Sequence, residues 1–340
     1  MLAVASFGHR TSAQTLTSSL FERYLETLRE QAGIPAMSAA VVQNGVIVWQ
    51  QGFGRADVEA NEPAQPHTPY LIGEVSQTIG ATLLLRKCID QNSATINDPV
   101  AEWVSGFGEA STTLGHLIAH ITPGGEFNYD RVRFAALTPV IEACSKSTYR
   151  KLLDDEIFVR FGMVDSAPGT AMATPTAADR ELFDADRLDE HAAVLRRVAS
   201  PYKVDSRARA ERTTLAPTAV DASYGIVSSV RDLAYFDHAL SDSRNLLLEP
   251  GNRDAAWTRA APQFPTGLGW FVQDYNGTQV VWQFGVVTDA YSSLIVKLPS
   301  RRLTFVLLAN SDKLNTPFAL ENGDVTASVF ARLFLRIYFP

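Results

Sequence analysis

Residues 37–51, MSAAVVQNGVIVWQQ, decide the fold class of this chain. Two runs rich in β-branched and apolar residues are separated by Asn44-Gly45, the dipeptide best suited to a two-residue hairpin, because both turn positions need a positive φ. The stretch predicts two antiparallel strands, 37–43 and 46–51. Ahead of it, apolar residues at helical spacing over 18–31, after Thr17 or Ser18 as a cap, predict an amphipathic helix that packs on a sheet.

The rest of the chain divides into a helical middle and a second set of strands. Helical spacing begins at Val75, strand character stays low to about residue 210, and residues 171–215 are typical of surface loops and short helices. Strand patterns return at 268–274, 279–283, 292–298 and 303–310. A helix at 229–240 precedes them and an apolar helix at 325–338 closes the chain.

This order predicts a fold that is α/β plus all-α: an antiparallel sheet flanked by terminal helices, with an inserted helical domain. We expect the sheet domain to be discontinuous, from 15–60 and 220–340, and the mainly helical domain to span 61–219. Residues 1–14 are expected to form a tail.

Composition excludes several classes of protein. The 340 residues include 30 Lys and Arg against 37 Asp and Glu, a formal net charge of -7, with no basic run that would suit a nucleic-acid partner. No run approaches the roughly 18 apolar residues of a membrane span. Cys88 and Cys144 lie in apolar helical contexts, which predicts buried free thiols rather than a disulfide.

The first residues, MLAVASFGHRTSAQ, combine a short apolar piece with small residues, like the tail of an export signal, although a basic start and a full apolar region are missing. This favours a periplasmic or secreted protein and leaves a cytoplasmic one open. Nothing in the sequence fixes the oligomeric state.

Several segments, taken together and in order, resemble the serine β-lactamase and penicillin-binding-protein-like hydrolases, in the branch of class C β-lactamases, esterases and D-aminopeptidases. The resemblance runs from about residue 20 to the C-terminus. It rests on residues 33–42 with the hairpin, GFGRADVEANEP at 52–63, PYLIGEVSQTIGATLLL at 69–85, INDPV at 96–100, GHLIAHITPG at 115–124, the pair 156–166 and 223–240, and TGLGW at 266–270 with 294–312. The resemblance implies the β-lactamase/transpeptidase-like fold.

The resemblance also implies a mechanism in which a serine attacks a carbonyl and a lysine one helical turn later takes its proton. The family's Gly-Ser-x-Ser-Lys stretch aligns with residues 73–77, which places Glu74 at the nucleophile position and Gln77 at the base position. Ser76 is no substitute, since no base follows it at the right spacing and a helix turns it roughly 200° away from Glu74. We interpret Ser76 as a capping or packing residue.

The family's two other motifs are altered as well. Its Tyr-x-Asn aligns with residues 129–131, so that Tyr129 is retained and Arg131 replaces the asparagine. Its basic or histidine residue followed by x-Gly aligns with residues 283–285, so that Gln283 replaces the proton donor and Gly285 is retained. Tyr129 is interpreted equally well as a pocket residue or a packing residue.

Two further hypotheses concern charged and metal-ligating residues. Glu74 and Arg131 are expected to face each other as a hydrogen-bonded ion pair, with a direction for the pKa of Glu74 that the sequence does not decide. His116 and His120, at i and i+4, superficially suggest a metal pair. With no third ligand placed by a motif, we interpret them as structural, and no metal or cofactor is expected.

Three functions remain open. The first is a β-lactamase-related protein that is not a serine hydrolase and binds a small molecule in the old cleft. The second is a retasked isomerase, lyase or cyclase that uses Glu74 and Tyr129 as acid and base without covalent chemistry. The third is a residual esterase or β-lactamase-like hydrolase that acts through Ser76 or a water activated by Glu74.

Overall fold

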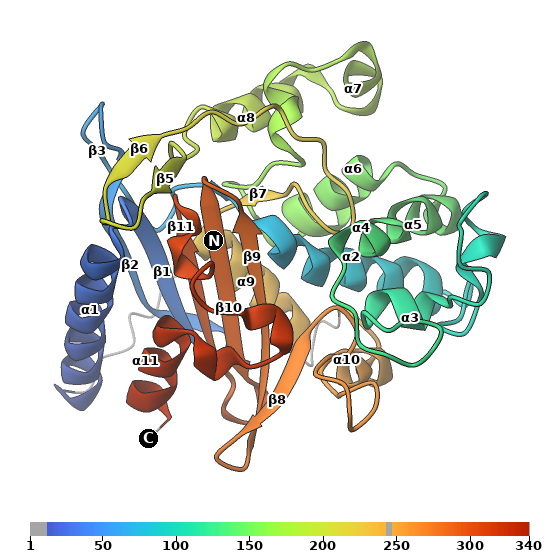
Figure 1. The fold of residues 1–340 in the computed structure, drawn as a ribbon. Helices are drawn as coiled ribbons and strands as arrows, with labels where there is room; N and C mark the ends of the chain where they lie inside the picture. The colour runs from blue at the N-terminus through green and yellow to red at the C-terminus, as the bar shows by residue number, and fades with distance from the viewer. Residues whose placement is uncertain (1–11, 243–246, 340) are drawn as a thin grey trace, which may run out of the picture.

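A computed structural model describes residues 12–242 and 247–339 of the chain. Its centre is a seven-stranded sheet in which every neighbouring pair is antiparallel (Figure 1). In spatial order the strands are β3 (Glu62–Pro63), β2 (Val46–Asp57), β1 (Ala36–Gln43), β11 (Leu303–Ala309), β10 (Tyr291–Leu298), β9 (Thr278–Val287) and β8 (Phe271–Tyr275). The expected antiparallel sheet is confirmed.

The opening hairpin forms as its sequence predicts. Asn44 has φ 53° and Gly45 has φ 77°, the left-handed conformations that a two-residue turn of this type requires. Strand β1 then pairs with β11, Met37 opposite Ala309, so that the sheet joins the two ends of the chain. All but the last residue of β1 are buried, because helices cover both faces of the sheet.

The terminal helices α1 (Ser12–Ala32) and α11 (Val329–Tyr338) pack together, and a core rich in aromatic residues lies between them and one face of the sheet (Figure 1). Helix α9 (Val230–Ser241) packs on β1 and β11. Helix α1 starts before the expected cap at Thr17 or Ser18, because the preceding Ala, Gln and Leu residues continue the helix readily. Residues 1–11 of the expected tail lie outside the described residues.

The remaining helices gather beside the sheet, as Figure 1 shows for α2 to α6. They are α2 (Ser76–Leu84), α3 (Leu114–Ile118), α4 (Arg131–Ala135), α5 (Leu137–Ser145), α6 (Tyr149–Leu152), α7 (Ala177–Leu182), α8 (Ala185–Leu195) and α10 (Pro250–Ala256). Two small antiparallel pairs, β4 (Tyr70–Leu71) with β7 (Val227–Ser228) and β5 (Tyr202–Val204) with β6 (Ala210–Arg212), complete the structure. Across the described ranges, no helix is long and apolar enough to cross a membrane.

Residues 171–215 hold the expected short helices and loops, and a short hairpin in addition. They contain α7 and α8 and the β5–β6 hairpin, and side chains cap both helices. Thr176 accepts from the Asp179 backbone N–H, and Asp184 accepts from the Arg187 backbone N–H. These caps stabilise helices whose apolar pattern is too short to identify by period alone. The boundaries of the two expected domains stay a prediction.

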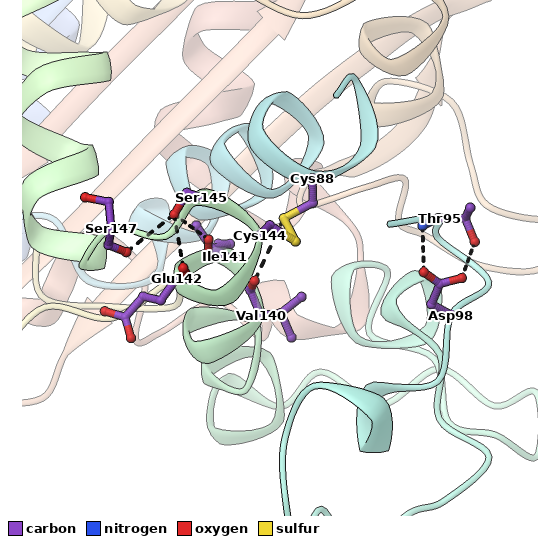
Figure 2. Close-up of a disulfide and its surroundings, with 9 residues drawn as sticks. All are labelled: Cys88, Thr95, Asp98, Val140, Ile141, Glu142, Cys144, Ser145 and Ser147. Carbon is purple, nitrogen blue, oxygen red and sulfur yellow. Dashed lines mark hydrogen bonds between the residues drawn. A yellow bond between two sulfur atoms is a disulfide. The ribbon is translucent and has the colours of Figure 1, made fainter. Parts of the chain in front are cut away.

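The prediction of free thiols is wrong, because Cys88 and Cys144 form a disulfide with Cα atoms 5.4 Å apart (Figure 2). Cys88 lies in a π-helical turn, Leu85–Ile89, that extends α2, and Cys144 lies near the end of α5. Both helices bury apolar faces in the same core, and their packing brings the two sulfur atoms together. The bond ties the helix that carries residue 77 to its neighbour.

Candidate functional site

Glu74 lies in a tight 3-10 turn, Gly73–Val75, that leads into α2 and contacts β9. Its Oε2 accepts a hydrogen bond from the backbone N–H of Val286 at 2.7 Å. Its own backbone N–H also lies close enough to the carboxylate to lower its pKa. Gly285 permits this close approach, since a Cβ there would lie within 3.0 Å of the Ile72 carbonyl oxygen and of the Glu74 nitrogen. Two backbone donors thus converge on one carboxylate.

Arg131, at the start of α4, forms the expected ion pair with Glu74, with 3.6 Å between Arg131 Nε and Glu74 Oε1. The expected hydrogen bond between them is not formed, and Val286 supplies the donor instead. The Arg131 guanidinium lies 4.5 Å from the centre of the Tyr224 ring, a cation–π contact. Burial raises the pKa of Glu74, against the opposing effects of the Val286 N–H and Arg131.

Gln77, one helical turn after Glu74, is completely buried in a network of neutral groups. Its Oε1 accepts from His120 Nε2 at 3.0 Å and from Gln283 Nε2 at 3.2 Å. His120 Nδ1 accepts from the Asp130 backbone N–H, which assigns the ring proton to Nε2. Burial, with a smaller contribution from nearby Arg133, lowers the pKa of His120 to about 3. The histidine is therefore neutral near pH 7.

Tyr129 closes the site with its ring among other aromatic rings. Its ring centre lies 4.5 Å from that of His120 and 5.4 Å from that of Phe284. Burial raises the pKa of the Tyr129 hydroxyl well above its ordinary value, and Glu74 raises it further. Gln77 lies close enough to oppose this shift, yet neither the Tyr129 hydroxyl nor Gln77 Nε2 makes a well-formed hydrogen bond with the described residues.

Residues 283–285, which the resemblance aligns with the third motif, form the β9 part of the site. Gln283 is 1% exposed, and its Oε1 accepts from the Phe284 backbone N–H at 2.9 Å. The Gly285 carbonyl accepts from Asn315 Nδ2 at 3.0 Å. All six candidate residues from the sequence therefore gather at one place. Within it, Glu74 pairs with Arg131, and Gln77 is held by His120 and Gln283.

Sequence reasoning missed four contributors to this site: His120, Tyr224, Val286 and Asn315. His120 was interpreted as structural, yet it holds the Gln77 side chain. The signal available for it was its place in the segment 115–124, which the resemblance matches. Val286 donates through its backbone N–H alone, and a backbone donor cannot be predicted from the type of residue that carries it.

Comparison with known proteins identifies the family of this chain. The sequence profile described as Beta-lactamase matches residues 21–328. The chain belongs to the beta-lactamase family. The resemblance to serine β-lactamases and penicillin-binding-protein-like hydrolases is therefore confirmed.

Curated relatives of this beta-lactamase family chain are distant. Protein flp of Staphylococcus aureus (strain MW2) is 21% identical over 338 residues, covering 86% of this chain and 63% of the relative. The human serine beta-lactamase-like protein LACTB, mitochondrial, is 29% identical over 105 residues, covering 29% of this chain and 19% of the relative. The chain thus matches less than two thirds of either relative's length.

Solved structures of family members share the fold. A class C beta-lactamase has a TM-score of 0.73 at 15% identity, covering 95% of this chain and 98% of that one. The D-alanine carboxypeptidase AmpC of Burkholderia cenocepacia has a TM-score of 0.71 at 18% identity, covering 94% and 99%. The octameric penicillin-binding protein homologue of Pyrococcus abyssi has a TM-score of 0.72 at 20% identity, covering 87% and 74%. At these identities the likeness extends to the fold alone.

Two serines of this beta-lactamase family member, Ser76 and Ser241, can be compared with the nucleophile of a serine hydrolase. Ser76 is completely buried, and its Oγ accepts from the Ile226 backbone N–H at 3.3 Å, which fits a packing residue. Ser241 Oγ does lie 2.8 Å from a lysine ammonium, that of Lys297. That pair is remote from Glu74: Lys297 lies four residues along β10 from Ser293, the partner of Gly285.

The histidine pair of this family member does not converge on a metal. His116 Nδ1 accepts from the Thr113 backbone N–H and completes a capping box of α3, whereas His120 points to Gln77. Within residues 12–242 and 247–339, no group of three or more His, Cys, Asp or Glu side chains is arranged to hold a metal ion.

Proposed function

We propose that this beta-lactamase family member binds a small, uncharged molecule in the old cleft and forms no acyl-enzyme. A carboxylate stands where the resemblance places the nucleophile, and a neutral amide stands where it places the base. The pKa of His120, lowered to about 3, leaves no proton acceptor of neutral-range pKa beside Gln77. Acyl transfer needs a nucleophile with a base within hydrogen-bond reach.

The observation that supports ligand binding is the buried Tyr129 hydroxyl, which faces the Gln77 side chain but makes no well-formed hydrogen bond with the described residues. A buried donor without a partner costs about 1–3 kcal/mol, so an acceptor group of a ligand would recover that free energy. Glu74 disfavours an anionic ligand and already takes up the backbone donor of Val286. A neutral carbonyl or amide compound fits this set of groups.

Covalent probes test the proposal directly. The protein is incubated with a fluorescent penicillin and a fluorophosphonate, and adducts are sought by intact mass spectrometry and located by peptide mapping. We expect none on any serine. An adduct on Ser76 or Ser241 would refute the non-hydrolytic reading, and Ser→Ala variants at those positions serve as matched controls.

A ligand screen follows by thermal shift with small neutral metabolites. A compound that binds in the cleft raises Tm in the wild type and raises it less in Tyr129→Phe, since the variant lacks the unpaired hydroxyl. Equal shifts in both proteins would place binding elsewhere and contradict the role given to Tyr129.

A second candidate function, acid–base catalysis without a covalent intermediate, is supported by the raised pKa of Glu74 beside Tyr129. A carboxyl group with a raised pKa is a better proton acceptor and donor near neutral pH. The distinguishing result is turnover of a screened ligand that disappears in Glu74→Gln while the thermal shift is retained. Binding without turnover in the wild type favours the first function.

Residual serine hydrolysis ranks last, because Ser76 accepts a backbone hydrogen bond and has no base beside it. Export from the cytoplasm also remains a proposal. The Cys88–Cys144 disulfide supports it, since disulfides persist mainly in oxidising compartments. Recovery of the protein in a periplasmic or culture-medium fraction would test this location.

A further inference from the structure

A cavity of about 630 Å³ lies on the face of the sheet that α9 covers. There α9 and α10 meet the turn between β1 and β2 and the turn between β10 and β11. Its volume falls in the range of small-molecule sites. Gly45 lines it from the first hairpin, Arg302 from the second, Ser241 from the end of α9 and Trp257 from the end of α10. The candidate site described above contributes no residue to it.

The floor of this cavity holds a lysine that is almost fully buried. Lys297, 2% exposed, lies 2.6 Å from Asp237 Oδ1, donates to Ser241 Oγ at 2.8 Å and has its ammonium 4.2 Å from the centre of the Trp257 ring. Burial lowers the pKa of Lys297, and Asp237 opposes that shift. Since a buried ion pair adds little net stability, its place at the floor of a cavity calls for another explanation.

Two polar groups that line the cavity, the Ser241 hydroxyl and the Arg302 guanidinium, are available to bind a ligand. Ser241 accepts from Lys297, and its own hydroxyl proton meets no acceptor among the described residues, so it is available to a ligand and the adjacent ammonium strengthens it as a donor. Arg302 is exposed and makes no ion pair with any described residue, whereas Arg253 is paired with Asp254. The lining carries three cations against two carboxylates, an excess of one positive charge on a chain of formal charge -7.

We propose that this cavity is a second binding site, for a small organic anion whose carboxylate or phosphate is held by Arg302 and the Ser241 hydroxyl. Arginine presents a planar set of donors that matches either group. Lys297 lies 2.6 Å from Asp237 Oδ1 and donates to Ser241 Oγ at 2.8 Å, so in this geometry the serine is the acceptor of the lysine and not a donor to it. The pair therefore serves recognition, not nucleophilic attack.

The cavity is distinct from the site around Glu74. Lys297 pairs with Val281 in β9, four residues from the Ser293–Gly285 pair, a separation of about 13 Å along the strand. The two sites also differ in charge. Glu74 presents a carboxylate with a raised pKa, whereas the free group of the cavity is a guanidinium.

Isothermal titration calorimetry of the full chain with benzoate and, separately, with inorganic phosphate tests this inference. Arg302→Gln removes the unpaired cation, and Ser241→Ala removes the free hydroxyl. The matched control is Arg301→Gln, because Arg301 belongs to the same turn but lies over Phe339 and does not line the cavity. Far-ultraviolet circular dichroism verifies that each variant is folded.

We expect saturable binding of at least one probe, weakened about tenfold or more by Arg302→Gln and by a smaller factor by Ser241→Ala, with Arg301→Gln unchanged. Preference for benzoate identifies a carboxylate site, and preference for phosphate a phosphate site. Absence of saturation at about 10 mM of both probes would overturn the inference. So would equal weakening by the two arginine variants, or weakening by Glu74→Gln.

Discussion

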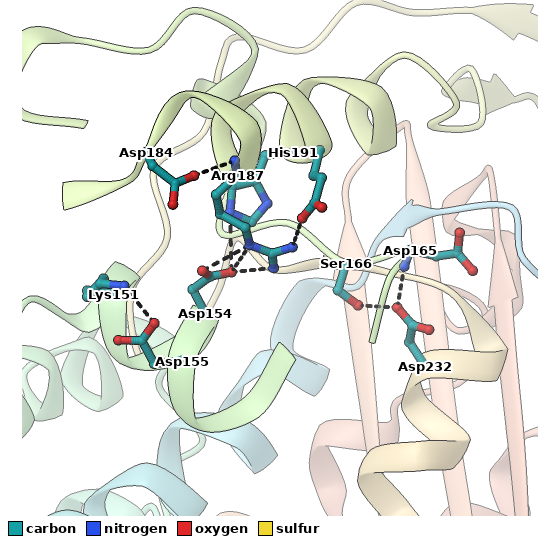
Figure 3. A network of polar contacts seen from close by, with 10 residues as sticks. Lys151, Asp154, Asp155, Asp165, Ser166, Asp184, Arg187, His191 and Asp232 are labelled. Carbon is teal, nitrogen blue, oxygen red and sulfur yellow. Dashed lines mark hydrogen bonds and ion pairs between the residues drawn. The ribbon is translucent and has the colours of Figure 1, made fainter. Parts of the chain in front are cut away.

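Asp232 makes the stability of this protein depend on pH in a direction that the structure fixes. It lies in the first turn of α9, which Ser229 caps, and its side chain is 1% exposed. Its Oδ2 accepts from the Asp165 backbone N–H and from Ser166 Oγ, both at 2.7 Å (Figure 3). Burial raises the pKa of Asp232 to about 7, with Asp165 adding to the rise.

The sign of the effect follows from this raised pKa. A carboxyl group that holds its proton more tightly when folded contributes stability that is fully present below its unfolded pKa of 3.8. That contribution is lost as pH rises through the folded pKa of about 7. The whole loss is about 4 kcal/mol, of which about 2–3 kcal/mol falls between about pH 5 and pH 8.

The perturbation is Asp232→Asn, which keeps an acceptor oxygen for the two donors and cannot ionise. Urea unfolding of wild type and variant is measured at intervals from about pH 5 to pH 8. We expect the wild type to lose about 2–3 kcal/mol relative to the variant across this range. The direct comparison cancels every other titrating group that the two proteins share.

A matched control is Asp155→Asn, which removes an exposed carboxylate from a surface ion pair with Lys151 (Figure 3). This variant is expected to follow the wild type in parallel across the pH range. Parallel curves for Asp232→Asn and wild type would refute the reasoning, because they would mean that the buried carboxyl group has the same proton affinity in the folded and unfolded chain.

Three other predictions concern stability. Reduction of the Cys88–Cys144 disulfide, or Cys88→Ser, should lower the free energy of unfolding measured in urea by about 4 kcal/mol, since the bond closes a loop of 56 residues. In the Cys88→Ser variant, added reductant should cause no further loss. Gly285→Ala should cost about 1–3 kcal/mol by urea unfolding, because the added methyl group has no room. Lys297→Met should cost about 3–5 kcal/mol by leaving Asp237 unpaired, and a second change, Asp237→Leu, should recover most of the loss.

The sheet was predictable because its signals are local. The Asn44-Gly45 turn and the β-rich runs on either side are contained in fifteen residues, and the terminal helices carry their own apolar stripes. Within 171–215 the sequence predicted short helices but neither their bounds nor the β5–β6 hairpin. These helices are short and depend on caps such as Asp184, whose single hydrogen bonds carry little weight in a pattern of apolar residues.

The disulfide was missed for a related reason. Cys88 and Cys144 each lie in an apolar helical run, and such a context is typical of a buried thiol. Their pairing depends on the packing of α5 against the extension of α2, a contact between residues 56 positions apart. No local signal reports the angle or depth at which two helices meet.

The candidate site was predictable where the resemblance assigned positions, and only there. Glu74, Gln77 and Gln283 come together as the aligned motifs require, although 206 positions separate the two glutamines. The donors that hold them were not predictable. His120 reaches Gln77 through the tight turn after α3, and Val286 reaches Glu74 through the backbone of β9.

These contacts make residue 77 dependent on the side chains around it. A lysine at position 77 would direct an ammonium at the Nε2–H of His120 and the Nε2 of Gln283, both of which now donate to the Gln77 oxygen. His120 cannot turn its acceptor to the lysine by changing tautomer without losing the bond that its Nδ1 accepts from Asp130. A lysine at position 77 would thus leave three donors facing one another, so we expect Gln77→Lys to lower the free energy of unfolding unless His120 and Gln283 change with it.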